Sequence, residues 1–139
     1  MQEKEKQSGF TLIEVLIVVT ITGLILGVAM PSYLESQKDS RRADATAELV
    51  QIMQLQERHF ANNRTYTIDL TDLGYATSPV TSEKALYTIA ASACAGGIAR
   101  CVELTATPQG KQAGDGTISL NSKGEKAATG DAQTADVWS

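Results

Sequence analysis

The sequence predicts an α+β fold in which one long N-terminal helix packs on a small antiparallel β-sheet. Three observations support this prediction: a long apolar run near the N-terminus, an amphipathic stretch directly after it, and three short alternating segments in the C-terminal half. Strands joined by short turns pair antiparallel, and a helix followed by strands is typical of the α+β class. The 139 residues suffice for one compact domain.

The apolar run covers residues 10–30 (FTLIEVLIVVTITGLILGVAM) and follows a polar, charged head at residues 1–9 (MQEKEKQSG). A helix of this length reaches about 30 Å, the thickness of the hydrocarbon core of a bilayer. An ordinary secretory signal carries its small-residue cut site after the apolar region. Here the small residue, Gly9, comes before the run. A cut at Gly9 would therefore leave the apolar helix on the mature protein.

A carboxylate, Glu14, interrupts the apolar run. Such a group costs several kcal/mol inside a membrane unless it is paired or lies near the interface. Glu14 therefore either lies close enough to the surface to reach water or be protonated, or it pairs with a positive group at the same depth. An α-amino group exposed on Phe10 by cleavage would be such a partner. Between two helices this pair would also fix the axial stagger, because only one register buries both charges together.

Three helix-weakening residues, Gly23, Gly27 and Pro31, punctuate the C-terminal half of the run. Glycine costs about 1 kcal/mol relative to alanine in a helix interior, and proline costs about 3 kcal/mol. One interpretation is a mild kink of the kind that transmembrane helices tolerate. The other is a weak segment that can melt and lengthen.

The helical pattern returns from Ser32 to about Asn62, where no glycine or proline interrupts it. Apolar residues at helical spacing form one broad face, which we expect to pack on the sheet. This face comprises Ala45, Leu49, Ile52, Met53 and Phe60. Arg41 and Arg42 are flanked by Asp39 and Asp44, so we expect solvated ion pairs there. The single histidine, His59, is expected to be a partly exposed helix residue.

Three segments after the helix show the alternation of half-buried strands: residues 86–93, 100–107 and 117–121. Turn-forming residues separate them, with Gly96 and Gly97 in the first turn and Gly110 to Gly116 in the second. This order predicts an antiparallel meander. Residues 65–83 are expected to form a connection that Leu70, Leu73 and Tyr75 anchor to the core.

The two cysteines, Cys94 and Cys101, bracket the first predicted hairpin loop. If the apolar run exports the chain, these thiols reach an oxidising compartment and are expected to pair across neighbouring strands. The alternative is two unpaired, small buried residues. Two sulfur ligands without a nearby histidine exclude a zinc site, so we expect no metal.

The composition and motifs also bear on the class of function. The formal net charge of -4 argues against a protein that coats nucleic acid. The sequence contains no glycine-rich phosphate loop, no nucleophile elbow and no convincing pair of carboxylates. We therefore expect a protein that is not an enzyme and that needs no cofactor.

The start of the apolar run resembles a known signal. Gly9-Phe10-Thr11-Leu12-Ile13-Glu14 followed by Val15-Leu16-Ile17-Val18-Val19 is similar to the class III signal of type IV prepilins. The resemblance implies that a prepilin peptidase cuts between Gly9 and Phe10, that Phe10 becomes N-methylated, and that Glu14 guides assembly. It also implies that the stretch from Gly23 to Pro31 loses helicity in the filament, and we expect the kink in the monomer. The family's leaders are usually basic, whereas Lys4 and Lys6 are offset by Glu3 and Glu5 here.

The resemblance divides the chain into a leader at residues 1–9, a transmembrane and assembly half-helix at 10–31, and a globular pilin domain at 32–139. It implies the bacterial inner membrane before assembly, with the globular domain in the periplasm, and an extracellular pilus afterwards. The implied partners are other pilin subunits, the prepilin peptidase and the pilus assembly machinery.

The globular part resembles the minor pilins often called PilE. The similar segments are Glu57-Arg58, Tyr66, Leu73-Gly74-Tyr75, Leu104 to Gly110 and Leu120 to Lys126. That group usually closes its C-terminal loop with a disulfide, whose cysteines would fall near Asp115 and just before Trp138. This chain has Asp115 and Val137 there. We therefore expect the disulfide in the first hairpin instead, and the ring of Trp138 to hold the tail down by its burial.

These resemblances imply a structural subunit of a type IV pilus, and we expect a minor pilin. Thr20-Ile21-Thr22 stands where abundant pilins tend to carry small apolar residues, which favours a minor over a major subunit. A type II secretion pseudopilin is one alternative, although residues 115–139 do not reproduce the calcium-site pattern of that class. A DNA-uptake pilin is another. Lys111, Lys123 and Lys126 could then cluster on phosphates, but the acidic total works against it.

Overall fold

The computed structural model describes residues 9–132 and 137–138 of the chain. Most of the predicted leader, residues 1–8, and part of the predicted tail therefore lie outside the described residues. The chain divides into two compact units, one up to Gln37 and one from Lys38 onward. Each unit is described by itself below.

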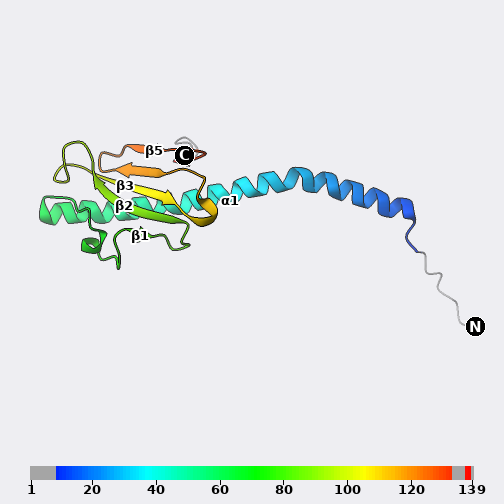
Figure 1. The fold of residues 1–139 in the computed structure, drawn as a ribbon, viewed down its shortest axis with the longest axis horizontal. Coiled ribbons are helices and arrows are strands. Elements are labelled where there is room, and N and C mark those ends of the chain that lie inside the picture. Colours follow the sequence, from blue (N-terminus) through cyan, green and yellow to red (C-terminus); the bar gives the residue numbers. More distant parts are fainter. Residues whose placement is uncertain (1–8, 133–136, 139) are drawn as a thin grey trace, which may run out of the picture. The chain divides into compact units, whose positions relative to one another are not determined.

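A single helix, α1, covers Leu12–Asn63 and belongs to both units (Figure 1). Its first half runs without interruption through Pro31. In this first unit, every described residue from 9 to 36 is exposed. The first half of α1 therefore gains no stability from side chains packed around it within the described chain.

The second half of α1 is amphipathic, as the sequence predicted. Its buried residues recur at helical spacing and comprise Arg42, Ala45, Leu49, Ile52, Met53 and Gln56. The amide of Gln56 is held on both sides by the connection after the helix: its Nε2 donates to the carbonyl of Thr67 at 2.7 Å, and its Oε1 accepts from the amide of Thr67 at 3.1 Å. Such two-sided pairing offsets the cost of burying an amide.

The sheet is a five-stranded antiparallel meander in the order β1-β2-β3-β4-β5. Its strands are β1 (Val80–Thr81), β2 (Tyr87–Ala93), β3 (Val102–Pro108), β4 (Ile118–Asn121) and β5 (Lys126–Ala128). The three predicted strands are confirmed as β2, β3 and β4 with small shifts of their ends. The two short edge strands, β1 and β5, were not predicted.

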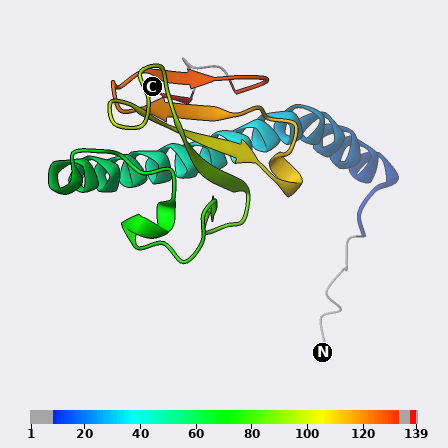
Figure 2. The ribbon, with the colours of Figure 1, turned by 60° about the vertical axis from the view of Figure 1, so that its left-hand side comes forward.

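The core lies between the second half of α1 and one face of the sheet (Figure 2). Leu49 and Ile52 from the helix meet Ile89, Leu104 and Ile118 from three successive strands, and all five are fully buried. The other face of β3 carries partly exposed Glu103 and Thr105. This is the alternation expected of a sheet with one packed and one solvated face.

Two short 3-10 helices, η1 (Leu70–Leu73) and η2 (Gly110–Gln112), lie in the connections. Asp69 caps η1, because its carboxylate accepts the amide of Thr71, and Gly74 ends it with a φ of 97°. Leu70 is buried, whereas Leu73 and Tyr75 pack on the edge of the core. The predicted anchoring role of these three residues is thus confirmed.

The hairpin between β2 and β3 is closed by a disulfide between Cys94 and Cys101, whose Cα atoms lie 5.3 Å apart. A backbone hydrogen bond from the amide of Cys94 to the carbonyl of Cys101 runs beside it. The pairing is that expected of an exported chain.

Candidate functional site

The helix begins with a local arrangement that involves Glu14. Thr11 precedes the first helical residue, and its Oγ1 accepts the backbone N–H of Glu14 at 3.3 Å. A threonine followed three residues later by glutamate is the pattern of a capping box, which satisfies free amides at a helix start. Glu14 therefore also lies where the positive end of the helix dipole favours a carboxylate. Phe10, one turn before it, is 85% exposed.

The first half of α1 presents a continuous apolar surface. Among the described residues, its large apolar side chains from Phe10 to Leu34 are all more than half exposed. The helix is long and apolar enough to cross a membrane, and none of that stretch is buried. Each large apolar side chain gains about 1.5–3 kcal/mol when fully buried. A surface of this kind is stable only against lipid or against other apolar helices.

The predicted weak segment, residues 23–31, is helical throughout in this structure, although Pro31 has no N–H to donate to the carbonyl of Gly27. An added Cβ at Gly23 or Gly27 would meet no atom within 4 Å, so packing within the chain does not require glycine at either position. The nearby hydroxyls of Thr20 and Thr22 donate to the carbonyls of Leu16 and Val18, each at 2.7 Å. The threonines thus satisfy their polar groups within the helix. Loss of helicity on assembly stays a prediction.

A second surface of interest lies where α1 ends and the β2–β3 hairpin turns. The amide of Tyr66 donates to the carbonyl of Ile98 at 3.3 Å, and the amide of Ser122 donates to the carbonyl of Val102 at 2.9 Å. Three segments distant in sequence are thereby joined at one end of the sheet. We call this the hairpin end; its exposed cations are Arg64, Arg100 and Lys123.

The cluster of Lys111, Lys123 and Lys126 that the alternative DNA-uptake function would need is not formed in this structure. Lys111 lies in η2 after the last residue of β3, whereas the turn that carries Lys123 is bonded to the first residue of β3. A seven-residue strand separates these positions by about 20 Å. Lys126 instead places its Nζ 4.9 Å from the centre of the Trp138 ring.

Trp138 is partly buried, and its Nε1–H donates to the carbonyl of Ala127 at 3.5 Å. The neighbouring Val137 is buried. The expected attachment of the tail by Trp138 is therefore supplied by both residues. Residues 133–136 and 139 of the predicted tail lie outside the described residues.

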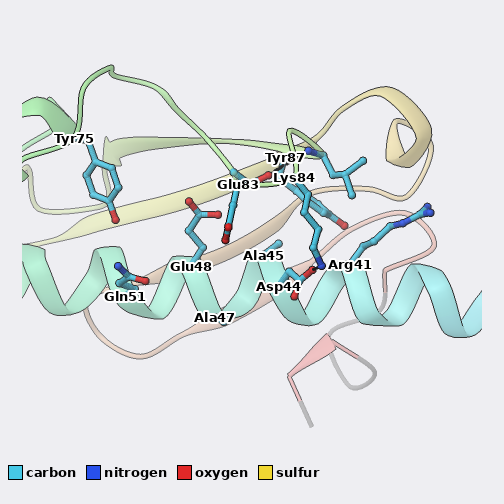
Figure 3. A pocket seen from close by; sticks show the side chains of 12 residues that line it. Arg41, Asp44, Ala45, Ala47, Glu48, Gln51, Tyr75, Glu83, Lys84 and Tyr87 are labelled. Atoms are coloured by element: carbon cyan, nitrogen blue, oxygen red, sulfur yellow. Dashed lines mark hydrogen bonds and ion pairs between the residues drawn. The ribbon is translucent and has the colours of Figure 1, made fainter.

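A cavity of about 400 Å³ opens between α1 and the segment that contains β1 and the start of β2 (Figure 3). Glu48 projects into it from the helix and Glu83 from the opposite wall, while Lys84 pairs with Asp44. Burial, together with the nearby charge of Glu83, raises the pKa of Glu48. This arrangement disfavours an anionic occupant such as phosphate. Nothing in the described chain forms a group of three or more metal-ligating side chains.

A buried ionic cluster was missed from the sequence. Arg42 is 4% exposed and forms a bidentate ion pair with Asp115, so the expected solvated pairing of Arg42 was wrong. Asp39 also accepts from Arg42, as its position in the sequence suggested. The missed partner lies 73 residues away in the chain. No local pattern marks such a pairing.

Two family models match parts of the chain. Residues 31–119 match the family model described as "Type IV minor pilin ComP, DNA uptake sequence receptor". Residues 4–30 match the "Prokaryotic N-terminal methylation motif". A solved type IV pilin from Shewanella oneidensis is 31% identical, covers 64% of this chain and 89% of its own, and superposes with a TM-score of 0.48.

The relatives include type IV pilus components and a component of a type II secretion system. The type IV major pilin protein PilA of Myxococcus xanthus is 30% identical over 88 residues, which are 63% of this chain and 39% of the relative. The type IV wide pilus major component PilA4 of Thermus thermophilus is 35% identical over 74 residues, 51% of this chain and 56% of the relative. The type II secretion system core protein G of Vibrio cholerae is 28% identical over 88 residues, 63% and 60% of the two chains.

The chain thus spans less than two thirds of the length of each of these curated relatives. The minor-pilin family model, in contrast, matches more than half of the chain, and the methylation motif matches its start. The chain therefore belongs to the type IV pilin family, in the minor-pilin group that the first of these models describes.

Proposed function

We propose that this chain is a minor structural subunit of a type IV pilus, made as a precursor that a prepilin peptidase cuts between Gly9 and Phe10. The observation that supports it best is the apolar surface of α1 from Phe10 to Leu34, which nothing in the described chain covers. A surface of this size requires an apolar partner. Its start coincides with the N-terminal methylation motif.

In the proposed precursor, the inner membrane covers this surface and the globular unit lies in the periplasm. In the extracellular pilus, the helices of neighbouring subunits cover it instead. The assembly machinery would transfer the helix from one apolar environment to the other. The same apolar side chains are buried in the membrane and in the pilus, so the hydrophobic free energy of the helix is nearly equal in the two environments. Polar groups must therefore decide how neighbouring helices align in the pilus.

Glu14 is the group that we propose decides the register. Cleavage frees the amine of Phe10, which becomes methylated and remains positive. Two unit charges about 4 Å apart attract by about 4 kcal/mol at an effective dielectric constant of about 20. A pair between Glu14 of one subunit and the amine of its neighbour therefore favours one axial stagger over all others. Weakening of the helix between Gly23 and Pro31 would let the subunits adjust their length around that pair.

Mass spectrometry of purified pili tests this function, because it gives the processed N-terminus and the copy number together. The expected subunit begins at methylated Phe10 and is present in substoichiometric amount. Glu14→Ala and Glu14→Gln should insert in the membrane but enter pili at less than about a tenth of the wild-type level, as the loss of about 1.4 kcal/mol already implies. Glu35→Gln, another exposed carboxylate of the first unit, is the matched control. Normal incorporation of both Glu14 variants would contradict the pairing.

A second candidate function is DNA binding during uptake, and two observations favour it. The matched family model describes a DNA uptake sequence receptor, and the hairpin end carries Arg64, Arg100 and Lys123 on segments joined by hydrogen bonds. Arginine and lysine at such a surface neutralise phosphates and release counterions. Exposed Glu125 lies in the same turn as Lys123 and limits the net positive charge.

Salt dependence distinguishes this second function. Three phosphate contacts predict a slope of about -2.7 in log K against log salt, or about a 40-fold loss of affinity between 50 and 200 mM salt. The double variant Arg100→Ala/Lys123→Ala should reduce the slope by about 1.8. Lys111→Ala, at the other end of β3, should leave it unchanged. Equal slopes for all three proteins would exclude the hairpin end as the DNA site.

A further inference from the structure

We propose that the buried ion pair between Arg42 and Asp115 is a latch. It holds the connection between β3 and β4, together with the chain segment that packs on this connection, against helix α1. When the pair is broken, these residues open locally while β2, β3 and the disulfide-closed hairpin stay folded. We call residues 109–117 and 129–132 the latched segment.

The Asp115 carboxylate is buried, and both of its oxygens accept hydrogen bonds. Arg42 donates from Nε to Oδ2 at 2.7 Å and from Nη2 to Oδ1, and the side chain of Asp115 is 2% exposed. Oδ2 also accepts from Nε2 of Gln112 at 2.8 Å and from the hydroxyl of Tyr87 at 3.4 Å. Donors from α1, β2 and η2 therefore converge on one carboxylate.

The electrostatic surroundings keep this carboxylate charged. Burial by itself would raise the pKa of Asp115, but the hydrogen bonds from Arg42 and Gln112 and the positive charges of Arg42 and Lys38 lower it overall. The guanidinium of Arg42 also donates to Asp39 at 2.8 Å, and Arg41 donates to Gln112 at 3.3 Å. Asp39, Arg41 and Arg42 of α1 therefore belong to one hydrogen-bonded network with Asp115, and Lys38 adds a nearby positive charge.

The backbone of Asp115 connects the latch to the C-terminal part of the chain. Its carbonyl accepts the amide of Ala132 at 2.9 Å, and Ala132 is fully buried. Next to it, Gly116 lies so close to Thr129 and Gly130 that no side chain would fit at position 116. The side chain of Asp115 thus fixes α1, and its backbone fixes residues 129–132. A single residue links three segments that are distant in sequence.

The disulfide cannot take over this task, because it lies at the other end of β3. Cys101 directly precedes the first residue of β3, whereas Asp115 follows its last residue through η2. The length of β3 separates the two by about 20 Å. The disulfide thus stabilises the end of the sheet at the β2–β3 hairpin, and the Arg42–Asp115 ion pair stabilises the opposite end. Local opening at the ionic end leaves the β2–β3 pairing and the disulfide in place.

Hydrogen–deuterium exchange of the full chain in detergent micelles at neutral pH tests the latch. Asp115→Asn removes the charge with little change of shape, and Arg42→Met removes the cation but keeps an apolar stem. Both variants should speed exchange of the amides of Thr129 and Ala132 by about 100-fold, since one buried partner is left without its counter-charge. The amides of β2 and β3 should stay within about 3-fold of wild type.

Three further measurements keep the proposal falsifiable. Lys84→Met breaks the exposed pair with Asp44, which also joins α1 to a loop, and should leave exchange unchanged. The double variant Arg42→Met/Asp115→Asn should restore slow exchange relative to Asp115→Asn, because no buried charge is then left without a partner and the amide oxygen of Asn still accepts from Gln112. Reduction of the disulfide should speed exchange only in the hairpin.

Two outcomes would overturn the latch. Uniformly faster exchange in all strands of Asp115→Asn would show that the pair merely contributes to global stability. Unchanged exchange of Thr129 and Ala132 would show that the pair holds nothing. Should Arg42→Met fail to fold, Asp115→Asn and the double variant still decide between these outcomes.

Discussion

Replacement of Gly116 by alanine should destabilise the protein far more than the same change at Gly124. Both glycines have a positive φ, 92° at Gly116 and 82° at Gly124. A Cβ added at Gly116 would lie 1.7 Å from the carbonyl oxygen of Thr129 and 2.4 Å from its carbon. A Cβ at Gly124 would meet nothing within 4 Å. The two variants therefore share the conformational penalty and differ in the steric one.

The difference can be worked out from the contacts. A left-handed conformation costs a residue with a Cβ about 1–2 kcal/mol, and this applies at both positions. At Gly116 the backbone around Thr129 must also move away. This movement disrupts the hydrogen bonds from the amide of Thr129 to Thr117 and from the amide of Ala132 to Asp115, both 2.9 Å long. Each contributes about 1 kcal/mol. We expect a loss of about 3–4 kcal/mol for Gly116→Ala and about 1.5 kcal/mol for Gly124→Ala.

Urea unfolding of the full chain in detergent micelles measures both values. The fluorescence of the single tryptophan, Trp138, reports the transition, because its ring packs on Lys126 and Ala127 beside the affected segment. The slope of the transition should stay unchanged if only stability differs. Equal midpoints for the two variants would refute the close approach of Gly116 to Thr129.

Three further predictions concern the leader, the cavity and the disulfide. Gly9→Val should block cleavage, so intact-mass spectrometry should find the precursor heavier than the mature subunit by residues 1–9. Glu83→Gln should stabilise the protein by about 0.3 kcal/mol at pH 7, the scale of a like-charge pair. Glu48 has a raised pKa, so its ionisation opposes folding; the stabilisation should vanish in thermal unfolding below the ordinary pKa of 4.5, where Glu48 is protonated in both states. Cys94→Ala/Cys101→Ala should lower the free energy of unfolding by about 2 kcal/mol, measured in the same urea assay.

The elements that could be predicted from the sequence are those with a local period. The apolar face of α1 and the alternation in β3 depend on residues a few positions apart, and Leu49 and Leu104 are buried as those periods require. The edge strands β1 and β5 have only two and three residues. So short a segment has no period, and only its pairing with β2 or β4 makes it a strand.

The ionic cluster could not be predicted for a different reason. Arg42 has acidic neighbours in sequence at Asp39 and Asp44, and local pairing with both was the natural expectation. The fold instead aligns Asp44 with Lys84 and places Asp115 against Arg42. Both of these pairs depend on how the loops before β2 and after β3 return to the helix. The pattern of charges along α1 does not indicate where these two loops contact the helix.

The two units of this chain differ in which groups lack a partner, and this difference indicates which residues serve folding and which serve assembly. In the second unit, every buried side-chain nitrogen and oxygen that the structure describes has a hydrogen-bond partner. Among the described residues, the buried polar side chains of this unit are therefore satisfied within the unit itself. The first half of α1 is the opposite case, because its apolar side chains have no partner in the described chain. Substitutions between Phe10 and Leu34 should consequently change membrane insertion and incorporation into pili, while those around Asp115 should change the stability of the subunit before it reaches the filament.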